Sequence, residues 1–165
     1  MAISVGDKLP DTTFTVMGAE GPESKSTSDV FAGRTVALFA VPGAYTPTCH
    51  KAHMPGFVDR VEELKGKGCD AVACTAVNDV FVLNNWAGDT GANGKIEMLA
   101  DGSADFAKAL GLQIDLTSRG LGVRSKRYSM LVKDGVVAVL NVEDAPPSHD
   151  VSSAETLCSR IDSSL

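Results

Sequence analysis

Five short apolar runs along the chain predict the strands of a sheet. The first, Thr35–Val41, is apolar at almost every position and stops at Pro42-Gly43, as expected of a strand buried on both faces. Four further runs follow: Ala71–Val77, Ile96–Ala100, Tyr128–Val132 and Val136–Val142. The tripeptide Lys133-Asp134-Gly135 between the last two runs predicts a hairpin.

Helical patterns separate these runs. The longest begins near Thr46 and carries one apolar stripe before two glycines end it; the stripe is Phe57, Val58, Val61 and Leu64, and the glycines are Gly66 and Gly68. Pro55 lies inside this pattern. Because proline cannot donate to the carbonyl four residues back, we expect the helix to kink or break there.

Three further helices have recognisable starts. Asn78-Asp79 predicts a cap for a helix through Trp86, and Ser103 opens a helix through Leu110. Asp150 or Ser152 is expected to cap the last helix. One face of that helix is apolar, with Val151, Ala154, Leu157, Cys158 and Ile161.

The order of these elements predicts a fold class. Gly18–Pro22 reads as a turn between two short N-terminal strands, strands and helices then alternate, and a hairpin comes late. This order is typical of a thioredoxin-like α/β fold, with a central mixed sheet flanked by helices and an N-terminal hairpin extension. The length of 165 residues fits a single domain over 1–165.

The net charge and the lack of long apolar segments argue against several classes of function. The net charge is −6, which opposes binding to a phosphate backbone, so no nucleic-acid partner is expected. No apolar run approaches the roughly 20 residues of a membrane span, and residues 1–7 lack the basic and apolar start of a secretory signal. We therefore expect an intracellular reducing compartment: the cytoplasm, or the chloroplast or mitochondrion if a transit peptide has been removed.

The four cysteines are better interpreted as free thiols than as disulfides. They lie at positions 49, 69, 74 and 158, in a chain that is neither small nor rich in cysteine, and no C-x-x-C pair occurs. The three histidines lack metal-site partners at useful spacing, so neither a metal nor another bound cofactor is expected.

Cys49 is the thiol best placed for chemistry. If Thr46 is the N-cap, then Pro47 falls at the first helical position and Cys49 at the third. Unpaired backbone N–H groups and the positive end of the helix dipole favour the thiolate, which is the nucleophilic form. A buried, inert cysteine would be the better interpretation of the residue alone. The sharp turn from a buried strand into a helix, with flanking prolines, favours a reactive thiol.

The segment Pro42-Gly43-Ala44-Tyr45-Thr46-Pro47-Thr48-Cys49 resembles the active-site loop of peroxiredoxins, whose pattern is Pro-x-x-x-Thr-x-x-Cys. The resemblance covers essentially the whole chain and is to the peroxiredoxin-five group, most of all its plant type II branch. It continues through His53-Met54-Pro55-Gly56-Phe57, Val77-Asn78-Asp79, Gly120–Ser125, Arg127-Tyr128-Ser129 and Leu140-Asn141-Val142-Glu143.

This resemblance implies a function and a set of roles. The function is thiol-dependent reduction of hydrogen peroxide and alkyl hydroperoxides, in antioxidant defence and redox homeostasis, through a sulfenic acid. Cys49 would be the peroxidatic cysteine, Thr46 would bind the peroxide, and Arg127 would be the active-site arginine. Pro42 and Gly43 would form the substrate-binding loop. Arg124 competes locally with Arg127, but a solvated basic run is expected for Arg124 and Lys126.

The resemblance also implies partners. The reductant would be external, either glutaredoxin with glutathione or thioredoxin, and the chain would form a homodimer through faces near the active-site loop. Cys74 matches the second cysteine of the plant branch but lies mid-strand, where a rigid sheet opposes a disulfide with Cys49. Cys158 is expected to be a packed core thiol rather than a resolving cysteine, and Cys69 has no expected role.

Two other functions remain open at this point. A non-catalytic thioredoxin-like binding or chaperone module would keep the fold without an acidic thiol. A cysteine hydrolase would pair Cys49 with a histidine, and His53 lies four residues on. An orienting residue and an oxyanion hole are not evident, so we expect surface or capping roles for His50 and His53, and a core or interface role for Trp86.

Overall fold

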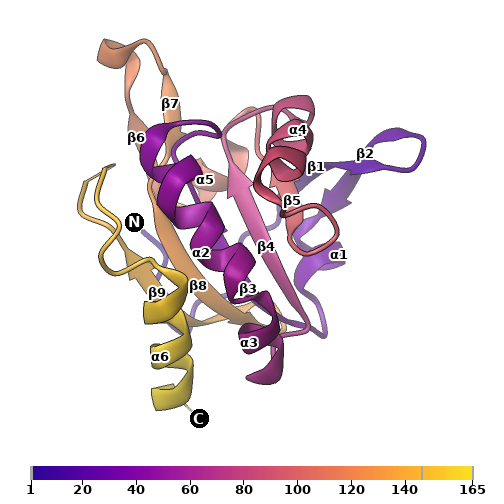
Figure 1. Cartoon of the computed structure of the whole chain (residues 1–165), viewed down its shortest axis with the longest axis vertical. Coiled ribbons are helices and arrows are strands. Elements are labelled where there is room, and N and C mark those ends of the chain that lie inside the picture. The colour runs from indigo at the N-terminus through magenta and orange to yellow at the C-terminus, as the bar shows by residue number, and fades with distance from the viewer. Residues whose placement is uncertain (1, 146, 165) are drawn as a thin grey trace.

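A seven-stranded mixed sheet forms the centre of the computed structural model, which describes residues 2–145 and 147–164 (Figure 1). The strand order is β2-β1-β5-β4-β3-β8-β9. The strands are β1 Thr13–Gly18, β2 Gly21–Ser26, β3 Thr35–Ala40, β4 Ala71–Ala76, β5 Glu97–Ala100, β8 Tyr128–Lys133 and β9 Val136–Val142. Each predicted strand is therefore present. The N-terminal hairpin β1–β2 extends the sheet at one edge, as expected.

Strand β3 lies in the middle of the sheet and carries the loop of residues 42–49 at its end. It pairs in parallel with β4 and antiparallel with β8. Its side chains alternate between two separate apolar cores, because successive residues of a strand point to opposite faces. Phe39 belongs to one core and Leu38 to the other, so β3 is buried on both faces, as its unbroken apolar run predicts.

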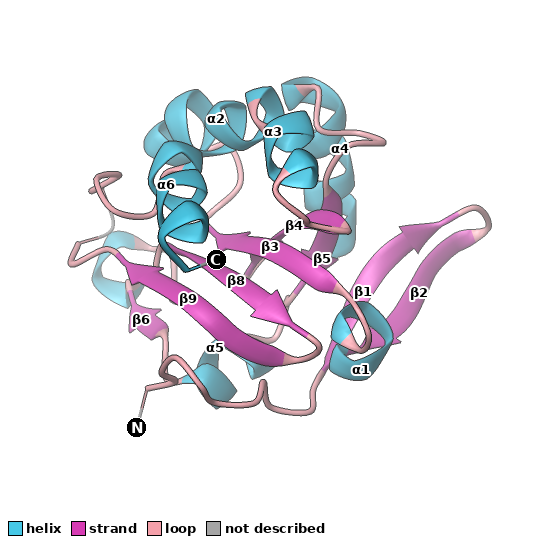
Figure 2. Ribbon diagram, turned by 90° about the horizontal axis from the view of Figure 1, so that it is seen from below, coloured by secondary structure: helices cyan, strands magenta, loops and turns pink. Residues whose placement is uncertain are grey.

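Helices cover both faces of this sheet (Figure 2). One face carries α2 Met54–Asp59, α3 Val61–Gly66, α4 Val80–Thr90 and α6 Ala154–Ser164. The other face carries α1 Thr27–Phe31 and α5 Asp105–Leu110. A small second sheet pairs β6 Gln113–Asp115 with β7 Val123–Ser125, beside a short 3-10 turn at Thr117–Arg119. The sequence pattern did not predict α1 or the small sheet.

The long helix predicted from Thr46 is divided into several pieces. A π-helical turn at Cys49–His53 leads into α2, and a break at Arg60 separates α2 from α3. The wide turn ends next to Pro55, as expected of a helix that proline disturbs.

Two predicted helix caps are wrong. Ser103 does not cap α5: Ala104 adopts a left-handed conformation at φ +62°, and the buried Asp101 carboxylate accepts from the Phe106 and Ala107 N–H groups at 3.0 and 2.9 Å. Neither Asp150 nor Ser152 caps α6. Ser153 does so, since its hydroxyl accepts from Thr156 N at 3.1 Å. Val151 therefore precedes the helix.

The cap predicted for α4 is confirmed. Asp79 accepts from Val82 N at 2.8 Å, and the helix continues one turn beyond Trp86 to Thr90, where Gly91 ends it in a left-handed conformation. None of the helices among the described residues is long and apolar enough to cross a membrane.

Candidate active site

The loop after β3 delivers Cys49 into a helical turn at the end of the sheet. His50 N donates to the Thr46 carbonyl at 2.9 Å, which places Thr46 at the N-cap position predicted for it. The Thr46 hydroxyl, however, donates back into the loop, to the Gly43 carbonyl at 2.6 Å. Thr46 therefore orders the loop as well as starting the helix.

The turn that holds Cys49 is wider than an α-helical turn. The Met54 N–H donates to the Cys49 carbonyl, five residues back, and Pro55 follows immediately. In an α-helix the ring of Pro55 would clash with the Lys51 carbonyl, and the π turn relieves this clash. The position of Cys49 thus depends on a proline six residues later in the sequence.

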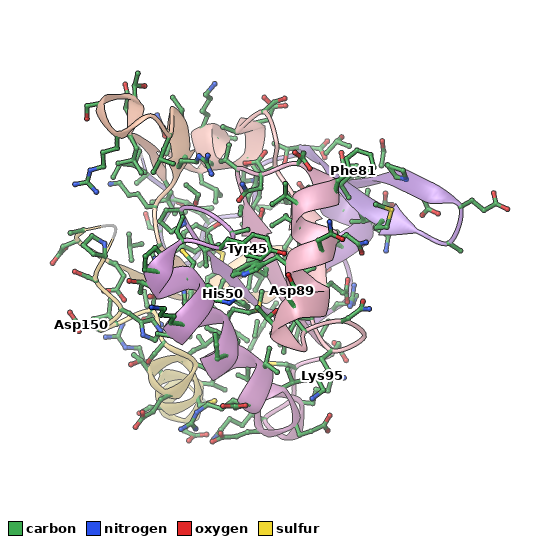
Figure 3. All side chains as sticks on the ribbon, turned by 45° about the horizontal axis from the view of Figure 1, so that its top comes forward. Tyr45, His50, Phe81, Asp89, Lys95 and Asp150 are labelled. Carbon is green, nitrogen blue, oxygen red and sulfur yellow. The ribbon has the colours of Figure 1, made fainter. Side chains whose placement is uncertain are left out.

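Contacts from β4 and α4 hold the loop in place. Asn78, two residues after the end of β4, accepts from Ala44 N at 2.9 Å. Tyr45 has a left-handed backbone at φ +64°, and its hydroxyl donates to Asp89 on α4 at 2.6 Å (Figure 3). The indole of Trp86, also on α4, donates to Nδ1 of His50 at 2.9 Å. The residues on either side of Thr46 are therefore fixed to a neighbouring helix.

Cys49 and Arg127 lie in direct contact. Nη2 of Arg127 donates to the Cys49 sulfur at 3.0 Å, and both side chains are buried. Arg127 comes from the segment just before β8, which pairs with β3, so the two residues are brought together by neighbouring strands. A guanidinium at this distance stabilises negative charge on sulfur.

A pocket of about 250 Å³ opens onto the Arg127 member of this pair. Its walls are mostly apolar, and Arg127 is one of its lining residues. The others are Pro42, Thr46, Pro47, Thr48, Leu116, Arg119, Leu121 and Pro147. Gly43 lies in the same loop, and a Cβ there would approach Nη1 of Arg124 and Cγ2 of Thr46 at 3.1 Å each. A larger residue at this position would therefore require one of these side chains to shift.

Comparison with known proteins decides the family. The Redoxin family profile matches residues 4–158. The chain is 46% identical to Peroxiredoxin-2E, chloroplastic, of Arabidopsis thaliana, over 94% of this chain and 68% of that protein. It is 43% identical to Peroxiredoxin-2B of the same plant, over 94% of this chain and 96% of that protein. The chain belongs to the type II, peroxiredoxin-five-like branch of the peroxiredoxins.

Solved structures of relatives agree. The crystal structure of reduced Prx3 in complex with H2O2 from Vibrio vulnificus has a TM-score of 0.92 and 46% identity, covering 96% of this chain and 99% of that one. Peroxiredoxin 5 from Alvinella pompejana has a TM-score of 0.86 and 32% identity, over 98% and 99%. The fold is thioredoxin-like, and a peroxiredoxin is a thiol-dependent peroxidase that works without a bound cofactor.

Two expectations about the peroxiredoxin site are wrong. Arg124 is not a freely solvated charge: it is half-buried, with Nε donating to the Leu121 carbonyl at 2.8 Å and Nη1 lying 3.4 Å from the Pro42 carbonyl. His53 is neither a surface nor a capping residue. It is fully buried, with Nδ1 3.1 Å from Nη1 of Arg127 and Nε2 2.9 Å from the Ser152 carbonyl. Trp86 is a core residue, as expected. His50 is half-buried and does not cap a helix; its ring accepts from the Trp86 indole.

The other three cysteines of this peroxiredoxin are buried thiols. Cys74 lies in the middle of β4, opposite Phe39 of β3, and burial raises the pKa of its thiol well above the ordinary value, with Cys49 adding to the effect. Burial raises the pKa of Cys69 to about 11 and also raises that of Cys158, which packs in the core as predicted. Among the described residues no cluster of His, Cys, Asp or Glu side chains suits a metal ion.

Proposed function

We infer that this peroxiredoxin reduces hydrogen peroxide and alkyl hydroperoxides at Cys49, within one domain. The observation that carries the proposal is the 3.0 Å contact between the Cys49 sulfur and Nη2 of Arg127, next to the pocket that Arg127 lines. A thiolate needs a fixed positive partner, and an apolar pocket beside that partner suits a small peroxide with an organic substituent.

The reaction balances without a metal or an organic cofactor. The Cys49 thiolate attacks one oxygen of the peroxide, so an S–O bond forms as the O–O bond breaks. The departing oxygen leaves as water or alcohol after taking a proton. Sulfur is oxidised by two electrons to a sulfenic acid, and the peroxide is reduced by the same two electrons.

The proposed roles of the neighbouring residues follow from their bonds. Because the Thr46 hydroxyl already donates to the Gly43 carbonyl, its lone pairs face other donors, and a peroxide O–H is a suitable one. Arg127 stabilises the charge that develops on the departing oxygen. Pro42 lines the pocket beside Thr46 and shields it from water, and Gly43 lets the loop close against Arg124.

The sulfenic acid is reduced by an external thiol, from glutaredoxin with glutathione or from thioredoxin. That thiol attacks the Cys49 sulfur to give a mixed disulfide and water, and a second thiol then releases Cys49. Two features favour this route over attack by Cys74 on the sulfenic acid: the pKa of Cys74 is raised, and its side chain is fully buried in β4. Such recycling suits antioxidant defence in a reducing compartment, whether cytoplasm, chloroplast or mitochondrion.

The assembly we propose is a homodimer packed through faces near the active-site loop. Tyr45 and Phe81 support it, since these aromatic side chains are 45% and 60% exposed, at the loop and on α4. Exposed aromatic side chains of this kind are enriched at protein interfaces.

The deciding experiment measures peroxide consumption by the full chain, with glutaredoxin and thioredoxin systems compared side by side. The Cys49→Ser variant is expected to consume no peroxide with either system, while Cys69→Ser, which changes another buried thiol, keeps wild-type turnover. Substantial peroxide consumption by the Cys49→Ser variant would refute the proposal.

A further inference from the structure

A closed ring of hydrogen bonds lies behind Cys49. Nη1 of Arg127 lies 3.1 Å from Nδ1 of His53, and Nε2 of His53 lies 2.9 Å from the Ser152 carbonyl. The Ser152 N–H and hydroxyl both donate to Oε2 of Glu143 at 2.6 Å. Glu143 N in turn donates to the Arg127 carbonyl at 3.0 Å. The four residues of the ring are all buried.

The chemistry of this ring fixes the state of His53. An arginine guanidinium only donates hydrogen bonds, so Nδ1 of His53 accepts and carries no proton. A backbone carbonyl only accepts, so Nε2 carries the proton and donates to Ser152. His53 is therefore the neutral Nε2–H tautomer. Burial lowers the pKa of His53 well below its ordinary value, and the charge of Arg127 lowers it further, which agrees with this assignment.

The guanidinium group transmits the position of His53 to the sulfur. It is planar and rigid, so fixing Nη1 also fixes the direction of Nη2, which contacts Cys49 at 3.0 Å. The imidazole is itself held by packing: its ring centroid lies 5.0 Å from that of Phe39 and 5.5 Å from that of Phe57. A neutral acceptor is needed here, because a carboxylate would compete with the Cys49 thiolate for the charge of Arg127.

We propose that His53 is a positioning residue for the peroxidase reaction, holding the Arg127 guanidinium in line with Cys49 while the Glu143–Ser152 pair holds His53. This inference rests on the proposed function, since it assigns how Arg127 is kept in place for that chemistry. It gives a role to a histidine that touches neither the sulfur nor the pocket. The role is to supply one uncharged acceptor and one donor with fixed directions.

The test compares His53→Leu with His53→Gln in the full chain. Two rates are measured for each: oxidation of Cys49 by hydrogen peroxide, and alkylation of Cys49 by iodoacetamide. A misplaced guanidinium affects peroxide reduction more than alkylation, because only the peroxide reaction needs charge stabilised on a departing oxygen. We expect His53→Leu to lower the ratio of the two rates about tenfold or more. Glutamine can both accept and donate, so His53→Gln should recover most of the ratio.

A matched packing variant separates positioning from loss of stability. Leu64→Ala removes a fully buried side chain of the same apolar core, on α3 and outside the hydrogen-bonded ring. Its melting temperature should fall while the ratio of peroxide to alkylation rates stays within about twofold of wild type, since that ratio depends on preorganised donors. If Leu64→Ala lowers the ratio as far as His53→Leu does, the ratio reports general loss of packing and the inference is wrong.

A second variant tests the ring where His53→Leu does not fold. Glu143→Gln weakens the anchor of Ser152 and should lower the same ratio, by less than His53→Leu. Where His53→Leu does fold, combining it with Glu143→Gln should give a non-additive effect, because both changes act through one connected network. Full additivity, or a folded His53→Leu protein with a wild-type ratio, would overturn the inference. That outcome leaves the proposed function standing, which is tested separately by Cys49→Ser.

Discussion

The guanidinium of Arg127 lies 3.0 Å from the sulfur of Cys49, although 78 residues separate them along the chain. Arg124, three residues before Arg127, contacts the Pro42 carbonyl instead at 3.4 Å. The two arginines therefore serve different parts of the site. One faces the Cys49 sulfur, and the other contacts the loop that precedes Cys49.

This difference predicts unequal effects of removing each charge. Arg127→Gln should lower the rate of Cys49 oxidation by hydrogen peroxide about 100-fold or more, the usual cost of losing one preorganised donor. Arg124→Gln, which removes an equal charge from the same segment, should lower it less than about tenfold. Stopped-flow oxidation under pseudo-first-order conditions measures both rates. Equal losses in the two variants would contradict the assignment of Arg127.

Cys74 is expected to be dispensable for turnover. Its thiol is buried in β4 with a raised pKa, so it is a poor nucleophile toward a sulfenic acid. Cys74→Ser should retain most glutaredoxin-supported peroxide turnover. Peptide mapping of the oxidised wild-type protein should find no disulfide between positions 49 and 74. Collapse of turnover, together with such a disulfide, would establish Cys74 as the resolving cysteine.

Phe81 is expected to contribute to the homodimer. Phe81→Asp places a charge on the exposed face of α4, so it should raise the dimer dissociation constant at least about tenfold. Sedimentation velocity at several concentrations measures this change. Val5→Asp is the matched control, because Val5 is also 60% exposed and apolar but lies near the N-terminus. A monomeric wild-type chain, or equal effects in the two variants, would contradict this interface.

Asp101 should stabilise the fold through the start of α5. Its carboxylate accepts from two N–H groups of the first turn, at Phe106 and Ala107, so Asp101→Ala should cost about 1–2 kcal/mol of unfolding free energy. Ser103→Ala, at the position that the sequence pattern favours as the cap, should change the free energy by less than about 0.5 kcal/mol. Urea denaturation at neutral pH compares the two.

Glu143 should make stability depend on acid pH. Burial alone would raise the pKa of this carboxylate, but hydrogen bonds from Ser152 and Val151 outweigh burial and lower it below the ordinary 4.5. Because the pKa is lowered in the folded state, the carboxylate stabilises the fold above about pH 4.5, and this contribution is lost as pH falls through the lowered value.

Glu143→Gln removes that titration. The difference in unfolding free energy between wild type and Glu143→Gln should be largest near pH 7 and should shrink below pH 4.5. Urea denaturation across this range measures it. A difference that stays constant with pH would show that Glu143 does not act through its charge.

Strands β3, β4, β5, β8 and β9 were predictable because they are buried on one or both faces, which leaves a direct pattern in the sequence. The N-terminal hairpin was predictable from its turn residues. The Thr46 N-cap and the helix disturbed at Pro55 were predictable for a similar local reason, since both depend on residues a few positions apart. The cap of α5 was not, because Asp101 reaches past a left-handed Ala104 that no sequence rule favours. The small β6–β7 sheet is too short to show a periodic pattern.

His53 was missed, although a signal for it exists. Cys49, His53, Phe57 and Val61 follow one another at intervals of four residues and are all buried. Extending the apolar stripe of the helix backward by one turn would have placed His53 inside the protein. Its partners could not be predicted in the same way, because Arg127 and Ser152 reach it from distant parts of the chain.

The hydrogen-bonded ring joins residues from distant parts of the chain, so it cannot form until most of the chain has been synthesised. Cys49 is synthesised long before Arg127, Glu143 and Ser152, and the ring closes only when β8, β9 and the segment before α6 have docked. A nascent chain that already contains the cysteine therefore still lacks Arg127, which contacts its sulfur in the folded protein. If Cys49 reacts as proposed, we expect its reactivity toward peroxide to arise only after the last strands of the sheet have been synthesised.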